Sequence, residues 1–175
     1  MPIFKYKNIN STSEEAKDIA VRGCEPWTVV VADEQESGHG RKGEAWFSPA
    51  GGLYFSIVLP RSDIADLQTL TILAAFVVAK TIKENFDLEP MIKLPNDVFI
   101  NNKKVCGILT ENMISGEVKQ SIIGIGVNTN IDEFSQDLKD IATSIKIETR
   151  KEVNNEEILE KIISGLKDQL KIISQ

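Results

Sequence analysis

Residues 37–46 read SGHGRKGEAW, and the rest of the chain is organised around this stretch. Its glycines are interleaved with His39, Arg41 and Lys42, and apolar runs lie on both sides. Glycine lacks a Cβ, so the backbone N–H groups of such a loop approach an anion closely. The adjacent cations would complete a phosphate or carboxylate site. The pattern also fits an ordinary hairpin turn, so the other segments must decide between the two.

The bulk composition describes a single domain with a full core. The chain has 175 residues, of which 42% are hydrophobic and 26% charged, and its formal net charge is −6. An acidic balance argues against broad nucleic-acid binding. Two cysteines, Cys24 and Cys106, do not make a disulfide scaffold, and residues 1–10 lack a signal-peptide core. No apolar run approaches the ~18 residues of a membrane span, so we expect a cytoplasmic protein.

Hydrophobic periodicity predicts alternating strands and helices. The expected strands cover 3–9, 28–32, 53–59, 91–100 with an interruption at Pro95, 103–114 and 120–128. The expected helices run from Ser11 or Thr12 to Gly23, from Ser62 or Asp63 to about 85, and from Asn154 or Asn155 to the end of the chain. Residues 131–142 resemble a loop with one helical turn. The fold class that we predict is α+β, a mixed, largely antiparallel sheet with helices packed on it.

Two local patterns have both a structural and a functional interpretation. Ser11 and Thr12 precede Glu14 and Glu15 at capping-box spacing, and hydroxyls at a helix N-terminus are also available to a polar ligand. Glycines 107, 124 and 126 fall inside neighbouring strands, which predicts a sheet face that lies flat against something.

Lys93 is the residue that we expect to carry chemistry. It stands in an apolar run just before Pro95, and a buried lysine needs an anionic partner. The alternative is a side chain that extends to solvent from an edge strand. Asp97 would hold Lys93 in place, bind a metal or cap the turn, and the sequence does not choose among the three.

Taken together, five motifs resemble the catalytic domain of biotin–protein ligases. They are GHGRKG-x-x-W, KLPND, KKVCGILTE, GIGVNTN and ATSIKIETRKEV, and the resemblance extends from Ser11 to about Leu170. It implies the biotin/lipoate-ligase type of α+β domain, which is similar to class II aminoacyl-tRNA synthetases. It also implies a two-step reaction, in which biotin and Mg-ATP form biotinyl-5′-AMP and a lysine of a biotin carboxyl carrier protein then accepts the biotin.

The resemblance assigns roles to residues. Lys93 would bridge the biotin carboxylate and the α-phosphate, with Arg41 as the second catalytic cation. The implied biotin-binding residues are Ser11, Thr12, Gln35, Gly38, Arg41, Lys93 and Gly107. The implied ATP-binding residues are His39, Gly40, Arg41, Lys42, Trp46, Lys93 and Asn128. Mg²⁺ would arrive with ATP, and no separate metal site is implied.

The departures from the family pattern limit these expectations. His39 and Glu44 stand where basic residues are usual, and Leu94 replaces a tryptophan, which we interpret as a core change. We expect residues 1–175 to be one catalytic domain, without the N-terminal helix-turn-helix or the small C-terminal domain of relatives. We therefore expect no DNA binding, while self-association into a homodimer stays open.

Three alternatives remain. The first is a lipoate or octanoate ligase or transferase of the same superfamily, with Cys106 as a nucleophile, although Gln35 and KLPND favour biotin. The second is a non-catalytic protein that binds biotin or biotinyl-AMP. The third is a ligase whose missing domain is supplied by another chain.

Overall fold

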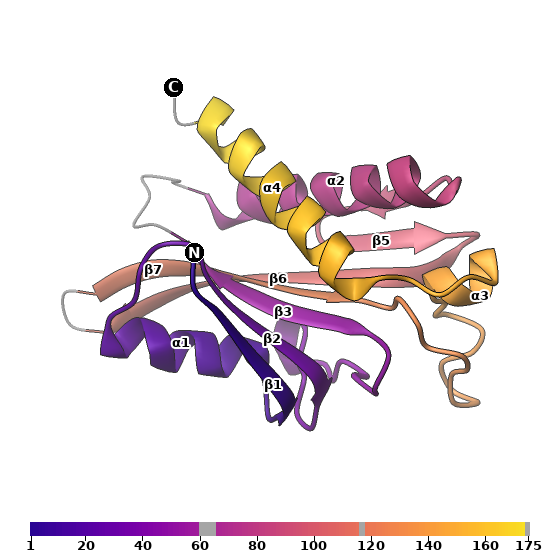
Figure 1. Ribbon diagram of the computed structural model, residues 1–175, viewed down its shortest axis with the longest axis horizontal. Coiled ribbons are helices and arrows are strands. Elements are labelled where there is room, and N and C mark those ends of the chain that lie inside the picture. Colours follow the sequence, from indigo (N-terminus) through magenta and orange to yellow (C-terminus); the bar gives the residue numbers. More distant parts are fainter. Residues whose placement is uncertain (60–65, 116–117, 174–175) are drawn as a thin grey trace.

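The computed structural model describes residues 1–59, 66–115 and 118–173 and is built on a seven-stranded sheet (Figure 1). Across the sheet the strand order is β1-β2-β3-β7-β6-β5-β4. The strands are β1 (Ile3–Ile9), β2 (Thr28–Gln35), β3 (Leu53–Val58), β4 (Met91–Lys93), β5 (Asp97–Ile100), β6 (Lys103–Ser115) and β7 (Val118–Val127). The β1–β2 pair is parallel, and the other neighbours are antiparallel. The predicted mixed, largely antiparallel α+β fold is confirmed.

Helices cover both faces of this sheet. The helices are α1 (Thr12–Arg22), α2 (Leu67–Phe86), α3 (Ile145–Thr149) and α4 (Asn155–Ile173). Helix α1 packs below β2, β3 and β7 in Figure 1, whereas α2 packs on β6 from the opposite face and α4 packs on α2. The larger core cluster lies between the sheet and the α2–α4 layer, and a smaller one lies beneath α1.

The helices form where the sequence predicts them, with caps that explain their ends. The Ser11 hydroxyl accepts from the Glu14 N–H at 3.4 Å, and Gly23 ends α1 at φ 88°. Such an N-cap contributes about 1 kcal/mol to helix stability. Helix α2 begins after Asp66, whose carboxylate caps it, while the expected caps Ser62 and Asp63 lie outside the described residues.

Three details differ from the sequence-based expectation. The predicted strand at 91–100 is two strands, β4 and β5, which pair with each other on either side of Pro95. Leu94 is 67% exposed in the turn between them, so its interpretation as a core change was wrong. Helix α3 was not anticipated, because a five-residue helix is too short to show a hydrophobic period.

The turn between β5 and β6 is the predicted hairpin. Asn101 and Asn102 adopt φ values of 49° and 64°, which suit a two-residue turn. The turn sets the pairing of β5 with β6, and the strand β6 then forms part of the floor of the site described below.

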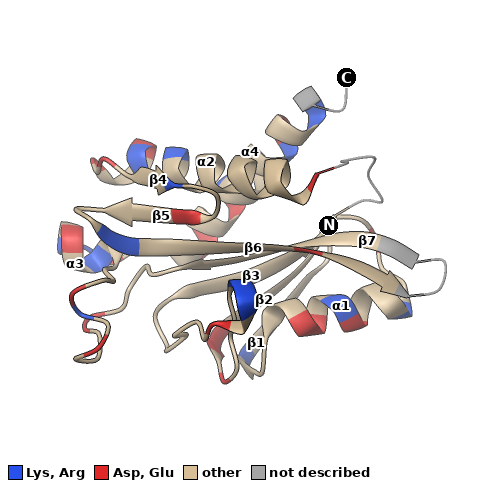
Figure 2. Ribbon diagram, turned by 180° about the vertical axis from the view of Figure 1, so that it is seen from behind, with Lys and Arg blue, Asp and Glu red and all other residues tan. Residues whose placement is uncertain are grey.

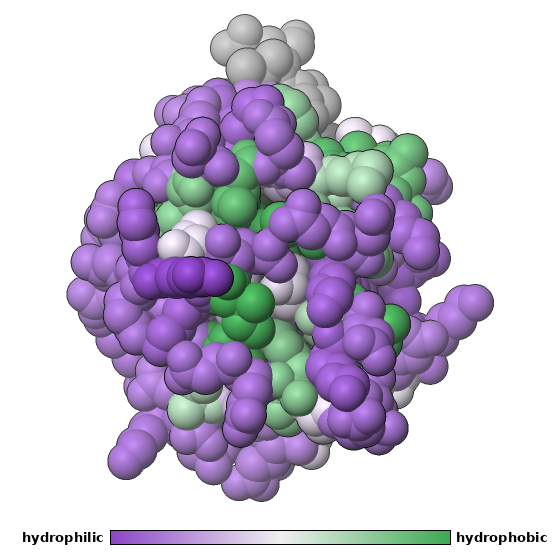
Figure 3. Space-filling view, turned by 90° about the vertical axis from the view of Figure 1, so that its right-hand side faces the viewer, coloured by the Kyte–Doolittle hydropathy of each residue, from purple (hydrophilic) through white to green (hydrophobic). Residues whose placement is uncertain are grey.

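The surface is largely polar. On the side seen in Figure 3, hydrophilic side chains cover most of the surface, and hydrophobic atoms show in a narrow band between them. Among the residues that the structure describes, no helix combines the length and apolar character that a membrane crossing requires.

Candidate active site

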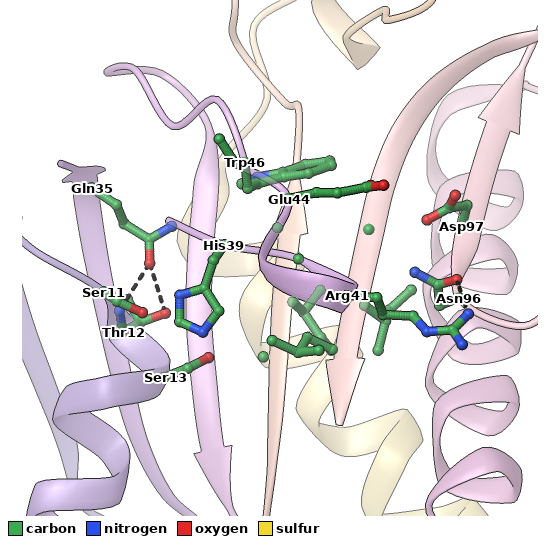
Figure 4. Close-up of a pocket in the computed structure, with 18 of the residues that line it drawn as sticks. Ser11, Thr12, Ser13, Gln35, His39, Arg41, Glu44, Trp46, Asn96 and Asp97 are labelled. Carbon is green, nitrogen blue, oxygen red and sulfur yellow. Dashed lines mark hydrogen bonds between the residues drawn. The ribbon is translucent and has the colours of Figure 1, made fainter. Parts of the chain in front are cut away.

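A pocket of about 270 Å³ opens between the start of α1, the glycine-rich hairpin and the strands β6 and β7 (Figure 4). Its lining comes from six separate segments of the chain. The lining residues are Ser11, Thr12, Ser13, Gln35, His39, Gly40, Arg41, Lys42, Glu44, Ala45, Trp46, Asn96, Asp97, Lys104, Gly107, Ile108, Leu109, Gly124, Ile125 and Gly126. Hydroxyl and amide groups gather at one end, and cations gather toward the other.

The polar end is a connected hydrogen-bond network. Gln35 Oε1 accepts from the Thr12 backbone N–H at 2.8 Å and from the Thr12 hydroxyl at 3.0 Å, as Figure 4 shows. Gln35 Nε2 donates to Ser48 Oγ at 2.9 Å. The buried Ser56 hydroxyl lies 2.9 Å from that of Thr12 and 3.0 Å from that of Ser13. A buried network of this kind suits a ligand head that carries both donors and acceptors.

Gly38 supports this end without lining the pocket. A Cβ at this position would lie 2.6 Å from Ser48 Oγ and 2.8 Å from Gln35 Nε2. Any side chain would therefore push against the Gln35 amide. The close approach of the backbone to the Gln35 side chain is what requires glycine here.

The glycine-rich stretch forms a hairpin that we call the lid, residues 38–46. Two backbone hydrogen bonds join its two arms: the Trp46 N–H donates to Gly38 O at 2.8 Å, and the Gly40 N–H donates to Glu44 O at 2.7 Å. At its tip, Lys42 adopts φ 58° and Gly43 φ 75°. The Arg41 guanidinium donates to Asn96 Oδ1 at 3.4 Å across the pocket. The lid therefore reaches from α1 to the turn between β4 and β5.

Trp46 covers Gly107 and Gly126, two of the three strand glycines that predicted a flat sheet face, whereas Gly124 lies against Ser13. A Cβ at Gly107 would lie 2.9 Å from Trp46 Cζ3, and one at Gly126 would lie 2.4 Å from Nε1. The Lys104 ammonium lies 5.1 Å from the centre of the indole ring. The absence of a Cβ at these two positions thus makes room for an aromatic wall of the pocket.

Lys104 is the pocket lysine that the sequence reasoning missed. Its Nζ lies 2.7 Å from Asp97 Oδ1, and both side chains are largely shielded from solvent. The register of β5 against β6 shifts between Val98 and Phe99. Val98 pairs with Cys106 and Phe99 with Lys104, so one residue of β6 between these partners has no partner in β5. This bulge breaks the alternation of faces and brings Lys104 to the same side as Gly107.

Lys93 does not line the pocket. It is exposed on the edge strand β4, and its Nζ lies 5.4 Å from the centre of the Phe99 ring. This arrangement corresponds to the edge-strand alternative that the sequence left open. The catalytic role expected of Lys93 stays a prediction.

Two further candidates lie behind the pocket wall. Asn128 is 3% exposed, and its Nδ2 donates to the backbone carbonyls of Thr143 at 3.0 Å and Lys104 at 3.4 Å. Cys106 is fully buried, and desolvation raises the pKa of its thiol. A buried, protonated thiol is a poor nucleophile, which weighs against the transferase alternative.

The structure thus brings most of the expected residues together. Nine of them line the pocket: Ser11, Thr12, Gln35, His39, Gly40, Arg41, Lys42, Trp46 and Gly107. Gly38 and Asn128 lie behind its wall, and Lys93 lies apart. Ser13 and Lys104 are the polar side chains that sequence reasoning did not propose, and Asn96 and Asp97 join them from the turn after Pro95.

The fold and this pocket are those of a known protein family. Residues 6–128 match the model of the Biotin/lipoate A/B protein ligase family. The chain belongs to this family.

Two relatives are similar to this chain over most of its length. The chain is 39% identical over 161 residues to the bifunctional ligase/repressor BirA of Bacillus spizizenii. This alignment covers 89% of this chain and 49% of the relative. It is 37% identical over 123 residues to the biotin–[acetyl-CoA-carboxylase] ligase of Paracoccus denitrificans, covering 68% of this chain and 51% of that one. The chain therefore spans about half the length of these curated relatives.

A solved structure gives the same result in three dimensions. The biotin protein ligase from Aquifex aeolicus in complex with biotin and ATP superposes with a TM-score of 0.90 and 33% identity. The superposition covers 99% of this chain and 72% of the Aquifex chain.

Proposed function

We propose that residues 1–175 form one catalytic domain of an ATP-dependent biotin–protein ligase. The domain would activate biotin to biotinyl-5′-AMP and then transfer it to a lysine of a biotin carboxyl carrier protein that serves a biotin-dependent carboxylase. The observation that carries this proposal is the pocket with hydroxyl and amide groups at one end and Arg41, Lys42 and Lys104 toward the other. Biotin has a matching polarity, with a ureido ring at one end and a carboxylate at the other.

The polar end favours biotin over lipoate or octanoate. The ureido ring offers a carbonyl acceptor and N–H donors to Ser11, Thr12, Ser13 and Gln35. The head of lipoate and the alkyl end of octanoate offer no strong hydrogen-bonding group, and the buried network would lose solvent without a partner. An unpaired buried polar group costs about 1–3 kcal/mol, so this end discriminates among acids of similar length.

The cationic end suits adenylation. The carboxylate of biotin attacks the α-phosphorus of ATP, and pyrophosphate leaves. Two anions must meet in this step, so preorganised cations lower its barrier. We assign to Lys104 the bridging role between carboxylate and α-phosphate, with Asp97 holding its ammonium in place and Asn128 supporting its backbone. Arg41, with Gly40 and Lys42 of the lid, would bind the phosphates.

The remaining parts serve the nucleotide and the second step. Trp46 offers an aromatic face to the adenine ring, and Mg²⁺ would enter with the phosphates of ATP. The amine of the carrier lysine then attacks the acyl carbonyl, and AMP leaves. The lid excludes water from the mixed anhydride in the meantime. Because ATP and the carrier protein of a carboxylase would be the substrates, we also propose a cytoplasmic location, in keeping with two free cysteines.

The test is ATP–pyrophosphate exchange by the purified chain with biotin, lipoate and octanoate offered in parallel. Exchange with biotin alone, followed by transfer to a carrier domain, is the expected result. Exchange with lipoate or octanoate instead would move the chain to the other branch of its family. Biotin binding by calorimetry without exchange would leave a binding protein, or one part of a ligase divided between chains.

A further inference from the structure

His39 lies in the lid and faces charged side chains of two other elements. Its Nε2 lies 3.7 Å from Glu14 Oε1 of α1. The candidate ligand atoms of His39, Glu14 and Glu111 of β6 all lie within 4.8 Å of one another. In Figure 4 the imidazole points away from the lid toward the start of α1, beside Ser13. His39 is the single histidine of the chain.

The charges around this imidazole do not balance without it. Lys17 Nζ lies 2.7 Å from Glu14 Oε1 and 3.1 Å from Glu111 Oε1. Burial opposes the charge of Lys17, but the hydrogen bonds to the two glutamates raise its pKa, so the ammonium stays charged. Two carboxylates and one ammonium leave one negative charge, which a protonated imidazole neutralises. In addition, Glu111 Oε2 is buried and has no hydrogen-bond partner among the described residues.

Lys17 also argues for a charge clasp rather than a metal centre. The ammonium lies between the two carboxylates, where a divalent cation would have to bind. Figure 2 shows that α1 carries both signs of charge along its length. The same carboxylates can therefore receive a second cationic side chain from the lid without any ion.

We propose that His39 is a positioning residue whose protonated ring fastens the lid to α1 and β6, so that the lid loosens as the pH rises. The groups that face the ring are Glu14 and Lys17 of α1 and Glu111 of β6. The lid itself adds Arg41, Lys42 and Glu44. Histidine is the type of side chain whose charge can change near neutral pH, so a clasp that needs a protonated ring predicts a lid whose closure depends on pH.

The consequence concerns retention of the ligand. A looser lid lets biotin and the biotinyl-adenylate leave faster, so dissociation accelerates with pH. This consequence rests on the proposed function for the identity of the ligand, whereas the clasp itself does not. Loss of one partly exposed ion pair predicts an increase of roughly fivefold in the dissociation rate.

The experiment measures dissociation of labelled biotin, chased by excess unlabelled biotin, from about pH 5 to about pH 8. The wild-type rate should rise with pH. His39→Gln should release biotin quickly at every pH, and His39→Arg slowly at every pH, because its charge is permanent. Glu84→Gln removes a surface partner of Lys80 on α2 and should follow the wild type. A merely structural role for His39 would not make Arg and Gln variants differ in this way.

A second readout tests the clasp without any ligand. In the Trp27→Phe variant, Trp46 of the lid is the remaining tryptophan. Acrylamide quenching of its fluorescence should increase with pH. The same quenching should not change with pH when His39→Arg is added to this variant. A pH-independent lid in the wild type, or the same pH slope in His39→Gln, would overturn the proposal even where biotin binds. A lid that responds to a chelator would overturn it in favour of a metal. Pocket preference for another acid, with the clasp intact, would count against the proposed function alone.

Discussion

The ammonium of Lys104 lies 2.7 Å from the carboxylate of Asp97, and this ion pair fixes the cation on the floor of the pocket. Asp97 follows directly after the turn that carries Arg41's partner Asn96. One turn between two short strands therefore orients both cations that we assign to the proposed adenylation step. A cation held in place before the reaction loses little energy to reorganisation as charge develops.

Lys104→Ala should lower the rate of biotin-dependent pyrophosphate exchange by about 10²–10³-fold, the usual cost of removing one preorganised charge-stabilising group. Lys93→Ala should lower the exchange rate far less, because Lys93 is exposed on the edge strand β4 and its ammonium lies over the Phe99 ring, outside the pocket. Exchange assays on both variants decide the matter. The reverse order would return the bridging role to Lys93.

Asp97→Asn should lower the exchange rate by about tenfold and leave the Kd for biotin nearly unchanged. The substitution keeps the size of the side chain but removes the charge that orients Lys104, so it affects the transition state more than the ground state. Asp132→Asn, which loosens a surface pair with Lys146, is the matched control. Equal losses in binding and turnover would mean that Asp97 supports the fold and not the reaction.

Thr12→Val should raise the Kd for biotin by about 5- to 150-fold, which corresponds to about 1–3 kcal/mol for an unpaired buried partner. The variant keeps the volume of the side chain but removes the hydroxyl that joins Gln35 to Ser56. Calorimetry with biotin and octanoate separates head recognition from general damage. If both affinities fell equally, the polar end would not be the site of discrimination.

Gly126→Ala should displace Trp46, because the new Cβ would lie 2.4 Å from Trp46 Nε1. We expect a loss of stability of about 1–3 kcal/mol and weaker ATP binding. In the Trp46→Ala background the same glycine substitution should cost much less. Denaturant titrations of the double-mutant cycle check this coupling, and additive losses would contradict the contact.

Stability should fall at alkaline pH, and Cys106 should contribute to the fall. Burial raises the pKa of this thiol in the folded state above its ordinary value of 9.0, so the unfolded chain releases the proton first. The stabilisation is complete below that value and is lost as the pH rises above it. Thermal unfolding from pH 7 upward should show a shallower alkaline decline in Cys106→Ala than in Cys24→Ala, which alters the half-buried cysteine. Identical declines would contradict this assignment.

The sequence predicts well what local chemistry determines. The cap at Ser11, the end of α1 at Gly23 and the turn at Asn101 and Asn102 depend on residues within a few positions of one another. The close approach to the sheet also follows from its strand glycines, because a glycine inside a strand commonly marks a place where another group lies against the backbone.

Lys104 could not be found in this way, since its position depends on pairing. Strict alternation along β6 would put Lys104 and Gly107 on opposite faces, and the bulge opposite Val98 and Phe99 reverses this. The apolar neighbours of Lys93 predicted a buried, functional side chain, yet an edge strand can leave such a lysine exposed. Which strand lies at the edge depends on the strand order of the whole sheet, so neither the sequence around Lys93 nor that around Lys104 predicts it.

The most direct test of the central claim is single-turnover formation of biotinyl-5′-AMP from biotin and labelled Mg-ATP, without a carrier protein. The account predicts that the wild-type chain accumulates the adenylate and that Lys104→Ala does not, although it still binds biotin. Failure of the wild-type chain to form the adenylate while it binds both substrates would contradict the account.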